Sequence, residues 1–224
     1  MIFSISKLGC ESSVITLDEP SSEWLKEYKF NLNALGNNGT KYSYSKKAIK
    51  IIKESASGYQ FVLVHGIWQF HSLAVYLALR NSNIPYYVYI HGALDPWFKK
   101  YYPLKHIKKY IYWILFEHNI LKSAKSVLFT SEEEKLLARK SFKPYSFKES
   151  VVGFGKEDKI FDSNNTNYFL SKYPVLKDKK ILLYVSRIHQ KKGFDILLNA
   201  FNIFSNDNPE YYLVMMGPDP ENFK

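Results

Sequence analysis

Two cationic side chains, Arg187 and Lys192, lie five positions apart just after the apolar run at residues 181–185. The run is typical of a buried strand, and the apolar spacing over residues 194–204 predicts a helix behind it. A helix N-terminus offers free N–H groups and the positive end of a dipole to an anion. Arginine adds a planar fork that fits phosphate, and lysine adds a mobile point charge. These residues predict a diphosphate site, and the alternative is a solvated basic turn.

The same segment, Ser-Arg-Ile-His-Gln-Lys-Lys-Gly-Phe-Asp at residues 186–195, carries a family resemblance. It resembles the phosphate motif in the second domain of the retaining GT-B glycosyltransferases of family 4. The usual form of that motif is a small residue, Arg, a short spacer and Lys-Gly. The resemblance implies that Arg187 and Lys192 hold the diphosphate of a nucleotide-sugar donor, either UDP-linked or GDP-linked. It also implies an α/β fold with two Rossmann-like domains built on parallel sheets.

Two His-Gly pairs follow apolar runs that are typical of strands: His65-Gly66 after residues 61–64, and His91-Gly92 after residues 86–90. The carboxyl ends of parallel strands form the ligand crevice of such folds, so both histidines are predicted to point at one rim. Glycine after each histidine permits a tight turn and the close approach of a ligand. The alternative is that backbone groups satisfy both imidazoles.

The family resemblance assigns roles to these two loops. It implies that His91 is catalytic and lies beside the donor sugar and diphosphate, facing Arg187 and Lys192 across a cleft. The loop at residues 65–68 would border the acceptor side, with Gly66 and Gly92 lining the cleft.

Residues 91–97 extend the resemblance to the polysaccharide-type members of the family. Asp95 would either bind an acceptor hydroxyl or cap the turn before Pro96, and the residue types favour the cap. Ser131-Glu132 resembles the family's Thr-Ser-x-x-Glu segment near the cleft. A role for Ser131 as the N-cap of the following helix explains that residue structurally.

The elements that must position these residues alternate between strand-like and helix-like patterns, which is typical of a mostly parallel sheet. We predict an acceptor-side domain over residues 1–157, a connection without periodicity over 158–178, and the start of a nucleotide-sugar-binding domain over 179–224. Further strands are predicted at residues 13–17, 126–130, 150–152 and 211–215, and further helices at residues 45–55, 72–80, 105–123 and 131–140.

Both ends are expected to be truncated relative to the resembling family. Residues 1–8 resemble the tail of a helix, with no strand or glycine-rich loop before it. The chain stops soon after the strand at residues 211–215, ahead of the family's paired glutamates. The fragment is therefore expected to be inactive by itself.

The chemistry is expected to need neither a metal nor a cofactor beyond the nucleotide-sugar substrate. Negative charge gathers on the departing nucleoside diphosphate, where Arg187, Lys192 and helix N–H groups would stabilise it. The sequence holds no Asp-x-Asp pair for a divalent ion and no Cys/His cluster with zinc spacing.

The formal net charge of +10 attracts nucleic acid, anionic membranes and phosphorylated ligands. Residues 97–125 hold seven lysines, one glutamate and eight aromatic residues, which is typical of a face that rests among lipid headgroups. The resemblance implies lipid-linked acceptors reached through such a face. The alternative is that Ile107, Ile111, Ile114 and Leu115 pack inward beneath solvated lysines. No nucleic-acid partner is expected, because no RNA-binding signature or zinc-finger spacing accompanies the lysines.

Composition agrees with a soluble protein of the cytoplasm, with 46% hydrophobic and 23% charged residues. The single cysteine excludes a disulfide framework, no apolar run could span a bilayer, and a secretory signal pattern is lacking. Peripheral contact with the inner face of the plasma membrane is also expected. The predicted function is hexose transfer from a nucleotide sugar to a glycan or lipid-linked acceptor in cell-surface polysaccharide biosynthesis. The alternative is a non-catalytic remnant that binds glycan, membrane or a protein partner.

Overall fold

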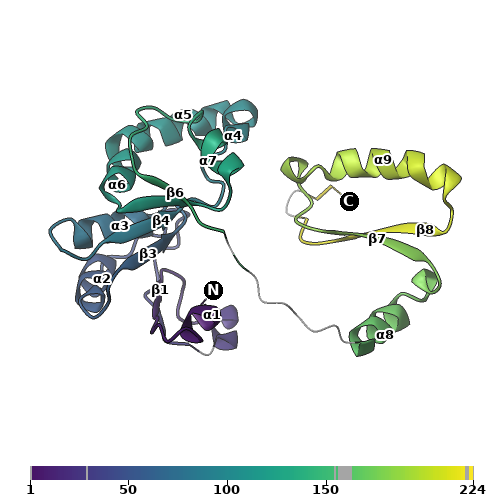
Figure 1. The fold of residues 1–224 in the computed structure, drawn as a ribbon, viewed down its shortest axis with the longest axis horizontal. Helices are drawn as coiled ribbons and strands as arrows, with labels where there is room; N and C mark the ends of the chain where they lie inside the picture. Colours follow the sequence, from purple (N-terminus) through teal and green to yellow (C-terminus); the bar gives the residue numbers. More distant parts are fainter. Residues whose placement is uncertain (1, 29, 154, 156–162, 220–221, 224) are drawn as a thin grey trace. The chain divides into compact units, whose positions relative to one another are not determined.

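The computed structural model describes residues 2–28, 30–153, 155, 163–219 and 222–223. The chain divides into two compact units, residues 1–157 (unit 1) and residues 158–224 (unit 2). In each unit, parallel strands alternate with helices (Figure 1). The α/β fold class expected from the sequence is confirmed.

The main sheet of unit 1 is parallel and has its strands in chain order. Every residue of its third strand is buried. Burial of a whole strand is expected where helices cover both faces of a parallel sheet. The strands are β3 (Val62–His65), β4 (Tyr86–Tyr89), β5 (Ser126–Phe129) and β6 (Glu149–Val151).

The hydrophobic core of unit 1 forms between this sheet and helices whose apolar residues recur every three or four positions. In the helix after residue 47, for example, Ala48, Ile52 and Ala56 are buried. The covering helices are α2 (Ala48–Ala56), α3 (Phe70–Leu79), α6 (His118–Ser123) and α7 (Glu132–Ala138). The smaller elements of unit 1 are α1 (Ile2–Ser6), β1 (Val14–Thr16), the 3-10 helix η1 (Glu23–Glu27) and β2 (Leu32–Ala34), with β1 and β2 paired in parallel.

The helix predicted over residues 105–123 is present, with a π-helical turn in its middle. It consists of α5 (Pro103–Tyr112), the π-helical turn η2 (Trp113–Glu117) and α6, and a short helix, α4 (Trp97–Tyr101), precedes it. The π-helical turn directs Trp113 and Glu117 inward, where both are 0% exposed.

The apolar residues on the outer side of this helix do not pack inward. Ile107, Ile111, Ile114 and Leu115 keep 57%, 58%, 48% and 59% of their surface exposed. The alternative in which they enter the core is therefore wrong for unit 1. The interior places are taken by Trp113, Ile120 and Leu121, which are all fully buried.

Unit 2 is built on two parallel strands with a helix between them. It contains α8 (Ser163–Lys172), the 3-10 helix η3 (Pro174–Leu176), β7 (Lys180–Val185), the 3-10 helix η4 (Gln190–Lys192), α9 (Phe194–Asp207) and β8 (Tyr211–Met216). Helix α8 lies in the segment at residues 158–178 that is predicted as a connection without periodicity. Its mostly polar sequence has no apolar stripe to indicate a helix. Residues 158–162 of that segment lie outside the described residues.

Within the described ranges, no helix combines the length and apolar character that crossing a bilayer requires.

Candidate functional site

The two predicted histidines meet at the carboxyl edge of the unit 1 sheet. His65 ends β3 opposite Tyr89, the last residue of β4, and His91 follows two positions later. His65 Nδ1 lies 2.9 Å from His91 Nε2, within hydrogen-bond distance. The rings of His65, Tyr89 and His91 are nearly parallel, with centroids 5.2–5.4 Å apart. The imidazoles therefore form one contiguous ring surface.

Electrostatics favour the neutral form of His65. Partial burial lowers its pKa from the usual 6.5, and His91 and His71 lower it further. Burial also lowers the pKa of His71, whose Nε2 lies 3.0 Å from the Gly66 carbonyl oxygen. The hydrogen bond between His65 Nδ1 and His91 Nε2 requires one of these two ring nitrogens to donate and the other to accept.

The loops that carry these histidines have unusual backbone conformations. Gly66 and Gly92 have φ values of 87° and 73°, and His91 has a φ of 51°. Glycine adopts this left-handed region freely, whereas a non-glycine residue there stores about 1–3 kcal/mol of strain. Strain of this kind clusters at functional sites, and the catalytic role of His91 stays a prediction.

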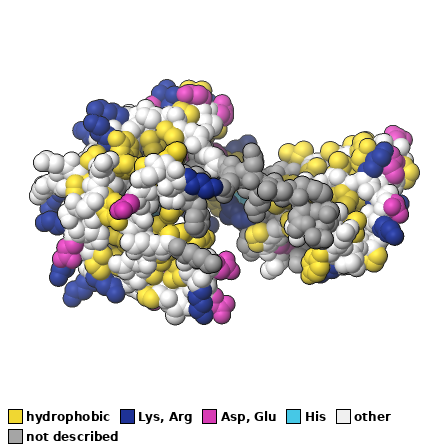
Figure 2. Space-filling view, turned by 60° about the horizontal axis from the view of Figure 1, so that its bottom comes forward, with side chains coloured by type: hydrophobic (Ala, Val, Ile, Leu, Met, Phe, Trp, Pro, Cys, Tyr) yellow, Lys and Arg dark blue, Asp and Glu magenta, His cyan; other side chains and the backbone are white. Residues whose placement is uncertain are grey.

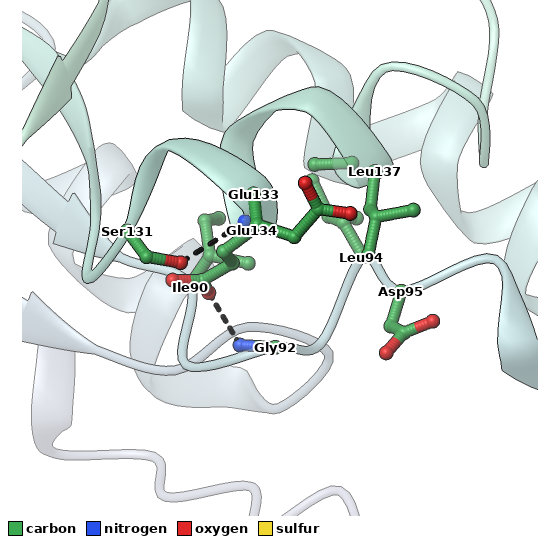
Figure 3. A pocket seen from close by; sticks show the side chains of 9 residues that line it. Ile90, Gly92, Leu94, Asp95, Ser131, Glu133, Glu134 and Leu137 are labelled. Carbon is green, nitrogen blue, oxygen red and sulfur yellow. Dashed lines mark hydrogen bonds between the residues drawn. The ribbon is translucent and has the colours of Figure 1, made fainter.

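Glu134, at the start of α7, fastens the loop after β4. Its Oε1 accepts a hydrogen bond from the Gly92 N–H at 2.6 Å, and its Oε2 accepts from the Thr130 N–H and hydroxyl, each at 2.7 Å. Its own N–H donates to Ser131 Oγ, the helix N-cap, at 3.1 Å (Figure 3). The family resemblance was carried by Ser131-Glu132, but the Glu132 carboxylate pairs with Lys135 at the surface. The Ser-x-x-Glu spacing of a capping box was the signal for Glu134.

A cavity of about 220 Å³ lies between this loop and α7. Asp95 from the loop and Glu133 from the helix line it, together with the apolar side chains of Leu94 and Leu137 (Figure 3). Asp95 Oδ1 also accepts a hydrogen bond from the Trp97 N–H at 2.8 Å, so the predicted turn cap is present. Its contact with an acceptor hydroxyl stays a prediction.

The predicted strand, basic turn and helix are present in unit 2. Arg187 follows β7, and the N–H of the next residue, Ile188, donates to the Pro218 carbonyl at 2.9 Å. Lys192 ends η4, and Gly193 is the N-cap of α9 with a φ of 66°. Both cationic side chains are exposed, and neither has an ion-pair partner among the described residues. They are therefore available to an anion.

The histidine pair belongs to unit 1 and the basic turn belongs to unit 2. That His91 faces Arg187 and Lys192 across a cleft stays a prediction, as does metal-free chemistry. Among the residues that the structure covers, no group of three or more His, Cys, Asp or Glu side chains could hold a metal ion.

Comparison with known families matches both units. Residues 4–145 match the model of Glycosyltransferase Family 4, and residues 169–224 match that of Glycosyl transferases group 1. None of the curated proteins searched matches the chain.

Eleven solved chains also match. One is Alr3699/HepE from Anabaena, whose crystal structure is a complex with UDP and glucose. It has 14% sequence identity and a TM-score of 0.62, and the match covers 93% of this chain and 53% of HepE. The chain thus spans about half the length of HepE, and the likeness extends to the fold.

Proposed function

Because the chain belongs to Glycosyltransferase Family 4, we propose that it serves hexose transfer from a nucleotide sugar to a glycan or lipid-linked acceptor. The observation that carries this proposal is the basic turn of unit 2, where Arg187 and Lys192 stand exposed before α9. The UDP and glucose in the HepE complex support UDP as the first donor nucleotide to test. Polysaccharide biosynthesis at the cell surface is the proposed setting.

In the proposed mechanism, the basic turn stabilises the departing nucleoside diphosphate. Arg187 and Lys192 bind its phosphate oxygens. The backbone N–H groups of the first turn of α9 also contribute, since the hydrogen bonds of this helix start with the Leu197 N–H, which donates to the Gly193 carbonyl. His91 lies by the donor sugar, and His65 keeps its imidazole oriented through their mutual hydrogen bond. The resemblance to retaining enzymes supports transfer with retained anomeric configuration.

The test is calorimetric titration of this chain with UDP. Arg187→Ala and Lys192→Ala each remove a charge-assisted hydrogen bond of about 1.5–3 kcal/mol, so affinity is expected to fall about 10- to 150-fold. Binding is expected to be unchanged by EDTA, because no metal takes part. Lys177→Ala is the matched control, since this exposed lysine precedes β7 at the opposite end of the strand.

Two results would contradict the donor site. Equal affinities in Arg187→Ala and the wild type would refute the role of that side chain. A folded chain that binds neither UDP nor GDP would support the non-catalytic alternative instead. In a full-length relative, the equivalent substitutions are expected to abolish donor turnover.

We also propose that residues 97–125 bind an anionic membrane surface, from which a lipid-linked acceptor is reached. Leu104, Ile107 and Ile111 lie on the outer side of α5 with 77%, 57% and 58% of their surface exposed. Exposed lysines stand on the same segment at positions 99, 100, 105, 108 and 122. Figure 2 shows apolar and basic side chains together at the surface of unit 1. Apolar side chains can insert at the boundary of the acyl chains, while the flanking lysines contact the anionic headgroups.

Liposome flotation with anionic lipid tests the membrane proposal. Wild type is expected to float with the liposomes, and less so at high salt, because screening weakens the contribution of about 1 kcal/mol from each lysine. Ile107→Asp combined with Ile111→Asp should leave most protein in the bottom fraction. Leu8→Asp is the matched control, because Leu8 is 81% exposed and lies outside the proposed face. Wild type that stays at the bottom, or equal loss in the control, would refute the proposal.

A further inference from the structure

Glu117 is an acidic side chain in the interior of unit 1 to which the proposed mechanism assigns no role. It ends the π-helical turn η2 and is 0% exposed. Its Oε2 accepts a hydrogen bond from the Trp68 backbone N–H at 3.2 Å, and its Oε1 is buried without a partner among the described residues. A buried carboxylate with an unsatisfied oxygen is costly, whereas glutamine would fill the same space as a neutral group. The acidic group therefore calls for an explanation, and π-helical turns often occur at functional sites.

The residue that Glu117 holds connects the two histidine loops. Trp68 lies three residues after His65, and its indole Nε1 donates to the Ala93 carbonyl oxygen at 3.2 Å, two residues after His91. Its φ of 75° is in the left-handed region, which a bulky residue keeps only when surrounding contacts impose it. The hydrogen bond from its N–H to Glu117 is one such contact.

We propose that Glu117 is a positioning residue that holds Trp68 in this conformation and thereby keeps the His65 and His91 loops in register. The ring of Trp68 is fixed from other sides as well, by Phe142 at a centroid distance of 5.2 Å and by Lys109 Nζ at 4.8 Å from the ring centroid. Backbone and side chain of Trp68 thus form one bridge from η2 through both loops. The importance of this bridge for glycosyl transfer rests on the proposed function. The bridge itself can be tested by an experiment that does not depend on enzymatic turnover.

The strength of this bridge should depend on pH. Burial raises the pKa of Glu117 to about 7, against the opposing effects of the Trp68 N–H, the Ser72 hydroxyl and Lys109. The other titratable groups that face it are Tyr112 and Tyr86, which stay neutral because burial raises their pKa values. As the pH rises through 7, Glu117 becomes an anion and its hydrogen bond from Trp68 becomes stronger. The loops should therefore be held more firmly at pH 8 than at pH 6.

NMR of the intact chain labelled with ¹³C at the glutamate carboxyl groups tests this directly. One carboxyl resonance is expected to titrate near pH 7, and the indole N–H resonance of Trp68, assigned with Trp68→Phe, should move with the same midpoint. In Glu117→Gln both titrations should vanish, because the amide keeps the size and the acceptor but carries no proton that titrates. Glu54→Gln, at an exposed site on α2, is the matched control and should leave both unchanged.

The proposal is overturned if every glutamate carboxyl resonance of the wild type titrates near pH 4.5. It is equally overturned if the indole N–H resonance of Trp68 still shifts near pH 7 in Glu117→Gln. It is also overturned if the two wild-type midpoints differ, and that comparison needs no variant to fold. UDP binding is measured separately by calorimetry. If the wild type binds UDP but shows no shared titration of Glu117 and Trp68, the bridge alone is rejected. If it shows the shared titration but does not bind UDP, the donor site alone is rejected.

Discussion

At the scale of single residues, the candidate site rests on a contact between two imidazoles that come from different strands. Parallel register places His65 beside Tyr89, and the strained turn after β4 returns His91 to the same edge. The lowered pKa of His65 means that protonation of this ring is disfavoured at neutral pH. In its neutral form the His65 ring carries one N–H donor and one acceptor nitrogen, so it can take either role in its hydrogen bond with His91.

His91→Ala should raise the pKa of His65, because it removes one of the groups that lower it. The pKa should stay below 6.5, since burial is the largest cause and remains in the variant. Long-range ¹H–¹⁵N spectra of the imidazoles recorded against pH measure both values. The pKa of His118, which burial and Lys122 lower, should be the same in both proteins. An unchanged pKa of His65 in His91→Ala would show that the two rings do not interact in solution, and a lower pKa would show that His91 favours the protonated form of His65 instead of opposing it.

At the scale of elements, the basic turn depends on how closely the ends of β7 and β8 approach. A Cβ atom on Gly217, just after β8, would lie 1.9 Å from the Ser186 carbonyl oxygen. No side chain fits there, so glycine is required directly beside Arg187. At Gly193, before α9, a Cβ would meet only Ile196 Cδ1 at 4.0 Å, although the φ is 66°.

Gly217→Ala should therefore harm unit 2 more than Gly193→Ala. The second change costs about 1–2 kcal/mol from the left-handed backbone alone, whereas the first adds a backbone displacement next to Arg187. Urea unfolding followed by circular dichroism and UDP calorimetry measure the two consequences. We expect Gly217→Ala to lower both stability and UDP affinity further than Gly193→Ala does. Equal effects would mean that the strand ends do not approach so closely in solution.

The order of strands and helices was predictable where local patterns are strong. Apolar runs located β3 and β4, the strands that lead to His65 and His91, and the Ser131 cap located the start of α7. The contact between His65 and His91 also follows from the rule that parallel strands share a carboxyl edge. The short strand β2, with its three residues, offers too little pattern to be recognised.

The remaining features depend on contacts between distant segments, which a local pattern does not contain. In the sequence, Glu117 is a single acidic residue in a basic segment. The π-helical turn brings it to the Trp68 N–H, 49 positions away. Trp68 itself gains its bridging place from the Ala93 carbonyl. Ile107 and Ile111 stay exposed, and the π-helical turn places Trp113 in the core instead.

At the scale of the whole chain, the two units differ in how much apolar surface they bury. The core cluster extends from Leu17 to Phe142 and lies entirely in unit 1. Among the described residues of unit 2, Leu176 and Phe194 are the buried apolar residues, while Leu183, Ile196 and Ile203 are 60–71% exposed. Since burial of apolar surface is the main favourable term in folding, unit 1 should be the more stable unit.

Urea unfolding should therefore occur in two steps that different probes separate. All four tryptophans, at positions 24, 68, 97 and 113, belong to unit 1, so their fluorescence reports on that unit alone. Circular dichroism at 222 nm reports on the helices of both units and should begin to change at lower urea. Coincident curves from the two probes would show that the chain unfolds as one cooperative body.

UDP should move only the earlier step, because a ligand stabilises the unit that it binds. At a concentration one hundred times its dissociation constant, the gain is about 2.7 kcal/mol. The first change in circular dichroism should then shift to higher urea, while the tryptophan curve stays in place. Arg187→Ala should cancel the shift at the same UDP concentration, and Lys177→Ala should keep it. A shift of the tryptophan curve with UDP would contradict a donor nucleotide site confined to unit 2, since only contacts within unit 1 could produce it.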